Sequence, residues 1–580
     1  MTKEHNMYTT QENVRIAIAM LKEYGVRKIV VSPGGTNVPV SQAVQDDPFF
    51  ECYSIPDERS AMYFAIGLHL KTGEIIATSC TSAQATRNYV PGLTEAFYKH
   101  VPIIALTTSK LERYAYQDYM QAPDQCSLPK DCVRHSFDMP PITDENTRAL
   151  CILNAKSALL EVLHGSQGPV QLNVRISDNQ QGLFEDVSLP AFPKVKRYMA
   201  WDDWNDIALE NKRVLVVVGE HRAFSEKQIK AIEGFCERYN ACVYVNNISN
   251  YRGKCAVQGN LLVYCGGMSK LQPEIVITIG GQTGDYGLFG ALCQLNNMEH
   301  WRVSEGGGLV DTYGKLTKIF ECPDFFFFDK ICSNKDKTNE HEYYNEWKKL
   351  NDAIDYETEL PFSNLYAAQQ LYKLIPGNST VNFAIHNSLR SWNFFPLNAR
   401  TQGYSTVAAF GIDGGTSMLI GESMCTDELC FMITGDLAFF YDMNALGLRH
   451  IKNNLRILLV NNDGGVEFRF LTNGWSENVH IDKYISARGH NGSAKGWAET
   501  CGFKYISART KEEFSILKEE FVSENEKPIL FEIFVSFEDE FAARNKLSSI
   551  NSQHTSKTKQ ILKNIIGKEK IYEIKSKLKK

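Results

Sequence analysis

The sequence predicts an α/β protein made of three doubly wound domains, each built on a parallel sheet. Short apolar runs that resemble buried strands alternate with segments of helical length along most of the chain. Several of these runs end in turns rich in glycine, serine or asparagine, which is where open α/β sheets bind ligands. The chain has 580 residues, more than one hydrophobic core supports, so we expect two to four domains.

Composition and charge narrow the class of protein. Apolar residues make up 43% of the chain and charged residues 22%, as in ordinary soluble globular proteins, and the net charge of -6 argues against nucleic-acid binding. No stretch reaches the ~18 uninterrupted apolar residues of a membrane span, and the first residues lack the basic and apolar blocks of a signal peptide. The fifteen cysteines have no zinc-binding spacing, which favours buried thiols over metal ligands. We therefore expect a cytoplasmic protein.

The first predicted domain spans residues 1–180. Its expected elements are helix 12–24, strand 28–31, helix 61–70, strand 75–80, helix 85–99, strand 103–107, helix 146–163 and strand 168–174. Gly35 and Thr36 follow the first strand, in a loop that is either a ligand site or a tight structural turn. Glu58 precedes the second helix, where an acidic side chain usually only complements the helix dipole.

The second predicted domain, residues 200–332, is another α/β unit. Its strands are indicated by apolar runs such as 213–218 and 273–279. The glycine-rich turn at 280–284 is a weak dinucleotide signal, because its spacing does not fit GxGxxG. A charged linker, 333–348, precedes the third predicted domain, residues 350–545.

The third domain carries the strongest functional signal. The runs 429–434 and 455–460 resemble buried parallel strands, and a segment of helical length, 439–453, lies between them. A right-handed crossover places these strands side by side or nearly so. Asp436 and Asn462 then meet just beyond the carboxyl ends of the two strands.

These side chains are typical of a cation site. Mg²⁺ prefers oxygen ligands, which here are a carboxylate, an amide oxygen and the carbonyls of the glycine-rich turn around Gly464, and substrate phosphates usually complete its shell. Each segment alone reads as an ordinary turn. Their combination in one crossover unit predicts a site for a cation and a diphosphate.

At these positions the chain resembles the thiamine-diphosphate-dependent enzymes, whose signature is Gly-Asp, some two dozen residues and then Asn-Asn. Within this family it is most similar to the menaquinone-pathway synthases. The matching segments keep their order along nearly the whole chain: SPGGTNVPV (32–40), DERSA (57–61), FGIDG (410–414), GDLAFFYDMNAL (435–446) and VNNDGG (460–465). The resemblance implies thiamine diphosphate and Mg²⁺ as cofactors, and a Rossmann-like central domain.

The resemblance also implies roles for individual residues. The metal and diphosphate site would be formed by Gly435, Asp436, Leu437, Asn462, Gly464 and Gly465, with Asp436, Asn462 and Gly464 as the metal ligands. Glu58 would be the catalytic acid that hydrogen-bonds the aminopyrimidine ring, and Ile412 would support the bent cofactor. Gln121 would face the reaction centre, with a solvated loop amide as the alternative. Because this family builds its site from two subunits, the resemblance implies a homodimer or homotetramer.

The chain departs from the synthases where they bind their substrates. The synthases carry arginines where this chain has Thr36 and Val407, and an apolar residue where it has Glu467. Neither Thr nor Val replaces an arginine clamp on a carboxylate. The remaining candidates for substrate binding are Gly35, Thr36, Gln121, His386, Asn387 and Arg390, although a loop histidine and exposed arginines are commonly structural or solvated.

The favoured interpretation is therefore thiamine-diphosphate-dependent decarboxylation of a different 2-oxo acid, with aldehyde release or carboligation to an acceptor. One alternative is the menaquinone-pathway reaction itself, on 2-oxoglutarate and isochorismate. The other is a non-catalytic relative that binds thiamine diphosphate.

A lysine-rich tail, residues 548–580, lies outside the resemblance. Its isoleucines and leucines have the spacing of an amphipathic helix. A solvated or subunit-docking tail is the ordinary interpretation, and contact with an anionic membrane surface is the alternative.

Overall fold

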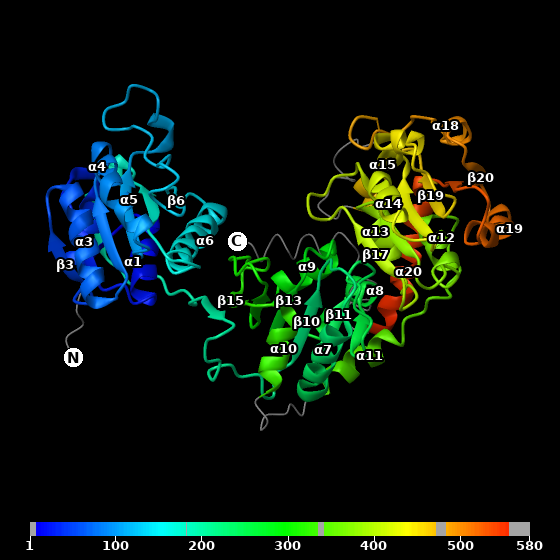
Figure 1. The fold of residues 1–580 in the computed structure, drawn as a ribbon, viewed down its shortest axis with the longest axis horizontal. Helices are drawn as coiled ribbons and strands as arrows, with labels where there is room; N and C mark the ends of the chain where they lie inside the picture. Colours follow the sequence, from blue (N-terminus) through cyan, green and yellow to red (C-terminus); the bar gives the residue numbers. More distant parts are fainter. Residues whose placement is uncertain (1–6, 181, 334–341, 471–482, 556–580) are drawn as a thin grey trace, which may run out of the picture. The chain divides into compact units, whose positions relative to one another are not determined.

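A computed structural model of the chain describes residues 7–180, 182–333, 342–470 and 483–555. The chain forms two compact units, residues 1–197 and 198–580 (Figure 1). All three large sheets of the described residues are built on parallel strands with helices packed against them, which confirms the predicted fold class. The predicted domain bounds stay a prediction.

The first unit contains one six-stranded sheet. In sheet order its strands are β3 (Glu51–Ser54), β2 (Lys28–Val31), β4 (Ile76–Cys80), β5 (Ile103–Ser109), β7 (Val170–Arg175) and β6 (Ser136–Met139). Its helices are α1 (Glu12–Glu23), α2 (Val38–Gln45), α3 (Glu58–Thr72), α4 (Gln84–Asn88), α5 (Val90–Tyr98) and α6 (Glu145–Glu161). A short antiparallel pair, β1 (Met7–Thr9) with β8 (Phe184–Asp186), lies apart from this sheet.

Side chains alternate between the two faces of this sheet, as the strand period of two requires. Ile104 and Leu106 of β5 belong to the core that also contains residues of α1 and α6. Ile103 and Ala105 belong to the core formed with α3 and α5. Helices therefore cover both faces, which explains why β4 and β5 are buried along their whole length.

The second unit contains two sheets. The first has the strand order β12 (Ala256–Gln258), β11 (Cys242–Val245), β10 (Val214–Val218), β13 (Ile275–Ile279), β14 (Glu299–Val303), β15 (Leu316–Glu321) and β9 (Lys196–Met199), and the unit boundary falls within β9. Its helices are α7 (Glu226–Tyr239), α8 (Asn260–Tyr264), α9 (Tyr286–Cys293) and α10 (Asp324–Cys332), followed by α11 (Tyr343–Asn351).

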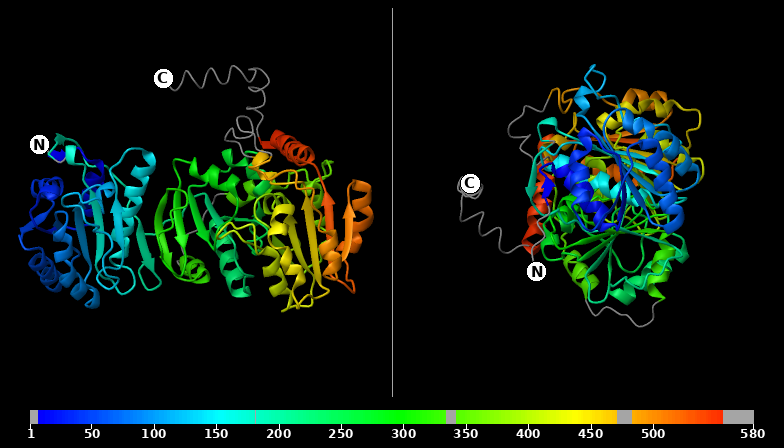
Figure 2. Two further views of the ribbon diagram at one scale, coloured as in Figure 1. Left: turned by 90° about the horizontal axis from the view of Figure 1, so that it is seen from above. Right: turned by 90° about the vertical axis from the view of Figure 1, so that its left-hand side faces the viewer.

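The second sheet of this unit has six strands. In sheet order they are β17 (Gln402–Ser405), β16 (Thr380–Phe383), β18 (Cys430–Gly435), β19 (Leu455–Asn461), β21 (Ile529–Phe534) and β20 (Lys504–Ala508). The helices are α12 (Asn364–Leu371), α13 (Asn387–Trp392), α14 (Gly415–Ser423), α15 (Asp436–Tyr441), α16 (Glu467–Phe470), α18 (Lys495–Thr500), α19 (Lys511–Phe521) and α20 (Phe537–Thr555). Figure 2 shows α20 in red, packed along this part of the chain.

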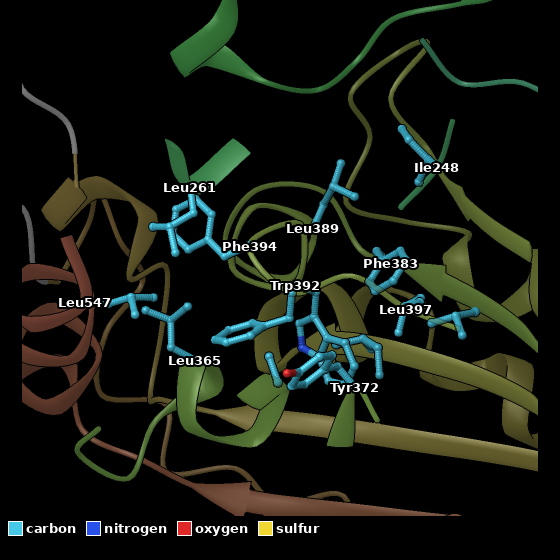
Figure 3. Packing of buried hydrophobic residues seen from close by; sticks show 14 of the residues in the cluster. Ile248, Leu261, Leu365, Tyr372, Phe383, Leu389, Trp392, Phe394, Leu397 and Leu547 are labelled. Carbon is cyan, nitrogen blue, oxygen red and sulfur yellow. The ribbon is translucent and has the colours of Figure 1, made fainter. Parts of the chain in front are cut away.

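One hydrophobic core joins the two sheets of the second unit. It combines Leu261 of α8 with Leu365 of α12, Trp392 of α13 and Leu547 of α20 (Figure 3). Because the same buried cluster also contains residues of β10 and β18, the two sheets form one compact body.

The structure differs from the predicted elements at three places. The helix expected over 85–99 is divided at Tyr89, because Pro91 stands in the first turn of a new helix. The helix expected over 439–453 is reduced to α15 and a short 3-10 turn, Met443–Gly447. The tail boundary predicted at 548 falls inside α20, and the isoleucines and leucines on which its amphipathic spacing rests lie outside the described residues.

Nothing in the described part of the chain forms a helix with the length and apolar character of a membrane span.

Candidate functional site

The site begins where β18 and β19 end. These strands are parallel neighbours, with Gly435 opposite Val460, so the predicted crossover is confirmed. Asp436 opens α15 and is only 2% exposed. Its Oδ2 atom accepts the backbone N–H groups of Asn462 (3.2 Å) and Gly464 (2.9 Å). The turn that follows β19 therefore folds around the Asp436 carboxylate.

The backbone at Gly464 requires glycine. Its φ of +144° lies in a region that other residues avoid, and a Cβ atom there would lie 2.7 Å from the Ser486 carbonyl oxygen. The neighbouring Gly465 donates its N–H to the same carbonyl oxygen at 2.6 Å. The two glycines thus allow the turn to approach the segment around Ser486 closely.

His490 is a member of this site that the sequence did not reveal. Its Nδ1 accepts the Gly492 N–H (2.8 Å), so Nε2 carries the proton and donates to Asp436 Oδ2 at 3.0 Å. Burial raises the pKa of Asp436 above its usual range, and the His490 hydrogen bond opposes that rise. A single histidine 28 positions after Asn462 gives no pattern from which this contact could be predicted.

Oxygen atoms at the site have capacity for a cation. The Asn462 Oδ1 atom is buried and has no hydrogen-bond partner among the described residues. Asp436 Oδ1 accepts only the Leu437 N–H (2.7 Å) within that same set, which leaves it a free lone pair. In the described ranges no three His, Cys, Asp or Glu side chains could hold a metal together. The donor set is therefore the mixed carboxylate, amide and carbonyl type that suits Mg²⁺.

A cavity of about 700 Å³ lies over these atoms, within the second unit. It is lined by ten of the residues singled out from the sequence: His386, Asn387, Arg390, Ile412, Gly435, Asp436, Leu437, Asn462, Gly464 and Gly465. Tyr264 and Tyr286, from α8 and α9, contribute to the opposite wall. The volume is in the range of small-molecule and cofactor sites.

Two polar residues of this cavity, Arg390 and His386, have distinctive surroundings or backbone geometry. Arg390 forms an ion pair with Glu467, and its guanidinium lies 4.3 Å from the centre of the Tyr286 ring. His386 has a left-handed backbone (φ +65°), and burial lowers the pKa of its ring. Strained non-glycine backbone of this kind is concentrated at functional sites.

Four other candidates belong to the first unit. Glu58 is the first residue of α3 and accepts a hydrogen bond from Asn88 Nδ2 (3.0 Å). Gly35 opens the 3-10 turn Gly35–Asn37, and Thr36 is buried in a cluster of hydroxyl groups, 2.8 Å from Thr81 Oγ1. Gln121 is exposed on a loop. The described cavity in the second unit therefore contains none of these four residues.

Two residues of α20 lie at or beside the cavity. Glu540 is 1% exposed, accepts the Asn364 N–H (3.2 Å) and the Asn387 side-chain amide (3.5 Å), and burial raises its pKa to about 7. Arg544 lies one turn further along and lines the cavity. No sequence pattern selects them, because α20 lies beyond the last matching motif.

Comparisons with known proteins identify the family of this chain. Residues 13–128 match the family model described as thiamine pyrophosphate enzyme, N-terminal TPP binding domain. The chain is 32% identical to the 2-succinyl-5-enolpyruvyl-6-hydroxy-3-cyclohexene-1-carboxylate synthase of Bacteroides thetaiotaomicron, over 91% of this chain and 96% of that protein. Proteins of the same name from Phocaeicola vulgatus and Christiangramia forsetii are 32% and 29% identical, over 92% and 90% of this chain and 97% and 95% of their own lengths. The chain therefore belongs to the family of thiamine-diphosphate-dependent enzymes, in the branch of the 2-succinyl-5-enolpyruvyl-6-hydroxy-3-cyclohexene-1-carboxylate synthases.

Proposed function

We propose that this chain catalyses the synthase reaction, in which 2-oxoglutarate loses carbon dioxide and the remaining four-carbon unit is added to isochorismate. The observation that carries the proposal is the cavity around Asp436, where ten predicted residues meet in a chain that matches the synthases over nearly its whole length. The comparisons thus favour the synthase reaction. The sequence had made this reaction only the alternative, because Thr36 and Val407 stand where the synthases carry arginines.

The residues around Asp436 fit the expected cofactors. Asp436, the Asn462 Oδ1 atom, which has no hydrogen-bond partner among the described residues, and the Gly464 carbonyl would hold Mg²⁺. Gly435, Leu437 and Gly465 would hold the diphosphate, and Ile412 would support the cofactor rings from the cavity wall. When bound, thiamine diphosphate supplies an electron sink for the decarboxylation of a 2-oxo acid.

Glu58 would supply the second part of the chemistry. Its carboxyl group would hold the proton shared with the aminopyrimidine ring, and the Asn88 amide would orient that carboxyl group. Because Glu58 lies in one unit and the metal site in the other, we propose that two chains form each active site, in a homodimer or a homotetramer.

The residues expected to bind the substrate carboxylate support a second candidate function. Thr36 is enclosed by hydroxyl groups and Val407 is fully buried in the core, so neither position offers a cation to a carboxylate. The charge of Arg390 is already balanced by Glu467. These contacts favour decarboxylation or carboligation of another 2-oxo acid by the same site.

Turnover of a substrate panel tests both candidates. Carbon dioxide release would be measured with 2-oxoglutarate and other 2-oxo acids, each with and without isochorismate, and products would be identified by mass spectrometry. The synthase proposal requires the isochorismate adduct from 2-oxoglutarate. An adduct or aldehyde from another 2-oxo acid alone would select the second candidate.

Two variants test the assigned residues. Asp436→Ala should weaken binding of Mg²⁺ and thiamine diphosphate, whereas Glu58→Gln should retain cofactor binding and lose turnover by about 100-fold or more. Full activity in both variants would refute the site. Cofactor binding without carbon dioxide release from any 2-oxo acid would identify a non-catalytic relative.

A further inference from the structure

The geometry points to an oxyanion-binding subsite at the α20 end of the cavity, formed by Arg544, a residue outside every matching motif. This inference deepens the proposed function and rests on it, because the oxyanion is either the terminal phosphate of the cofactor or a carboxylate of the 2-oxo acid. Arg544 would be a binding residue of the same site.

The guanidinium of Arg544 is buried and incompletely bonded. The residue is 5% exposed and lines the cavity. Its Nη2 atom donates to Asn387 Oδ1 (3.1 Å) and Ser391 Oγ (3.3 Å), both on α13. Its Nε atom is buried without a hydrogen-bond partner in the described part of the chain. An unmade hydrogen bond on a buried cation costs free energy that a bound anion would restore.

The surroundings of Arg544 determine which part of its guanidinium group can bind a ligand. Its guanidinium lies 3.7 Å from the centre of the Phe470 ring, so this aromatic side chain covers one face. Tyr264 lies 6.0 Å away on the wall formed by α8. With one edge bonded to α13 and one face covered, the remaining donors are available to the cavity.

Arg544 forms no ion pair within 4.0 Å among the described residues. Glu540, one turn away on the same helix, interacts with its charge only at longer range. Glu540 instead accepts hydrogen bonds from Asn364 and Asn387. Glu467 pairs with Arg390. Since buried charges are normally paired, an anionic ligand is the missing partner of Arg544.

Both candidate ligands suit a guanidinium. Its planar donors match the oxygen atoms of a phosphate or a carboxylate in two-point contacts. The terminal phosphate is favoured by position, because Glu540, one turn from Arg544 on α20, also interacts with Asn462 of the predicted metal site. A substrate carboxylate at the same position would make the same contacts.

Binding measurements on Arg544→Gln and Arg544→Lys distinguish the cofactor phosphate from the substrate carboxylate as the ligand of Arg544. Calorimetry on the cofactor-free protein with Mg²⁺ would compare thiamine diphosphate with thiamine monophosphate, and steady-state assays would give KM for the 2-oxo acid that the wild type uses. Lys546→Gln removes a cation from an exposed position of the same helix and is the matched control. Thermal melting would verify that each variant is folded, and Arg544→Lys keeps the test valid if the glutamine variant does not fold.

A phosphate contact predicts that Arg544→Gln raises the Kd for thiamine diphosphate by about tenfold or more, with less than about a threefold change for thiamine monophosphate. A carboxylate contact predicts an unchanged Kd and a KM raised by about tenfold. Unchanged Kd and KM, or equal losses for both thiamine phosphates with an unchanged KM, would overturn the inference. The calorimetric comparison needs no turnover, so absence of the synthase reaction would defeat the proposed function and leave this test intact.

Discussion

At the scale of single residues, the Asp436 carboxylate shows how the site stabilises a buried charge. Removal from water disfavours its anionic form, and hydrogen bonds from His490, Leu437 and Gly464 act in the opposite direction. Two of these bonds, from Leu437 and Gly464, come from backbone N–H groups, so they do not depend on the identity of a side chain. His490 supplies the one bond that depends on a side chain.

His490→Ala should therefore weaken the proposed metal site. Loss of a partner that orients a metal ligand typically lowers metal affinity by about 10- to 100-fold, and we expect a weakening of about tenfold for Mg²⁺ with thiamine diphosphate. Calorimetry would measure it, with His450→Ala as the control because His450 is exposed. Equal affinities in the two variants would show that His490 does not support the site.

At the scale of elements, the conformation of the turn after β19 depends on the glycine at position 464. A Cβ atom at Gly464 would meet the Ser486 carbonyl and the Arg488 backbone, at a φ that L-residues rarely adopt. Gly464→Ala should cost about 1–3 kcal/mol of unfolding free energy. Urea denaturation of the cofactor-free protein would measure this, and Gly435→Ala, where a Cβ would meet nothing within 4 Å, should change stability by less than about 0.5 kcal/mol.

Helix α14 carries an acid that should make stability depend on pH. Burial raises the pKa of Glu422 from 4.5 to about 6. This group therefore destabilises the fold as pH rises from about 4.5 through 6, and the cost is complete above that range. Glu422→Gln should stabilise the protein by about 1 kcal/mol at pH 7.5, less than the full shift because the side chain is only half-buried, and by nothing at pH 4.

Denaturant titrations at both pH values would test this effect. The glutamine can still accept the hydrogen bond of Asn382, so only the charge is removed. The exposed Glu428→Gln is the control. A gain of the same size at pH 4 and pH 7.5 would show that packing, rather than charge, is responsible.

The sequence predicted the elements that are determined by their local residue pattern. The strands that became β18 and β19 are apolar runs ended by glycine or asparagine, and the crossover rule placed Asp436 beside Asn462. The helix expected over 439–453 is not formed as such, and α15 ends at Tyr441, next to Asp442, which accepts hydrogen bonds from Ser417 N and Oγ (2.8 Å each), 25 positions away. Tertiary contacts of this kind leave no local pattern.

The missed site residues have the same explanation. Arg544 lines the cavity, and His490 and Glu540 contact lining residues, from segments far along the chain. Only the packing of α20 and of the loop around His490 brings them there. The selection of Gln121, which is exposed, stays a prediction.

At the scale of the whole molecule, the two halves of the proposed chemistry lie in different units. Glu58 belongs to the unit of residues 1–197, and the cavity with Asp436 belongs to the unit of residues 198–580. If each active site combines Glu58 of one chain with Asp436 of another, a chain with a defective Glu58 and a chain with a defective Asp436 can together form one intact site.

Mixing Glu58→Gln with Asp436→Ala should therefore restore activity. In a mixed dimer one site would contain both defects, and the other would contain intact Glu58 from the Asp436→Ala chain and intact Asp436 from the Glu58→Gln chain. With random exchange half of the dimers are mixed, so activity should return to about a quarter of the wild-type value. Co-expression with two affinity tags would isolate mixed dimers, which should reach about half of wild-type activity per dimer.

Each variant alone, and each variant mixed with itself, should remain inactive. If Glu58 and Asp436 of the same chain formed the site, every combination would be inactive, because no site would then hold both residues intact.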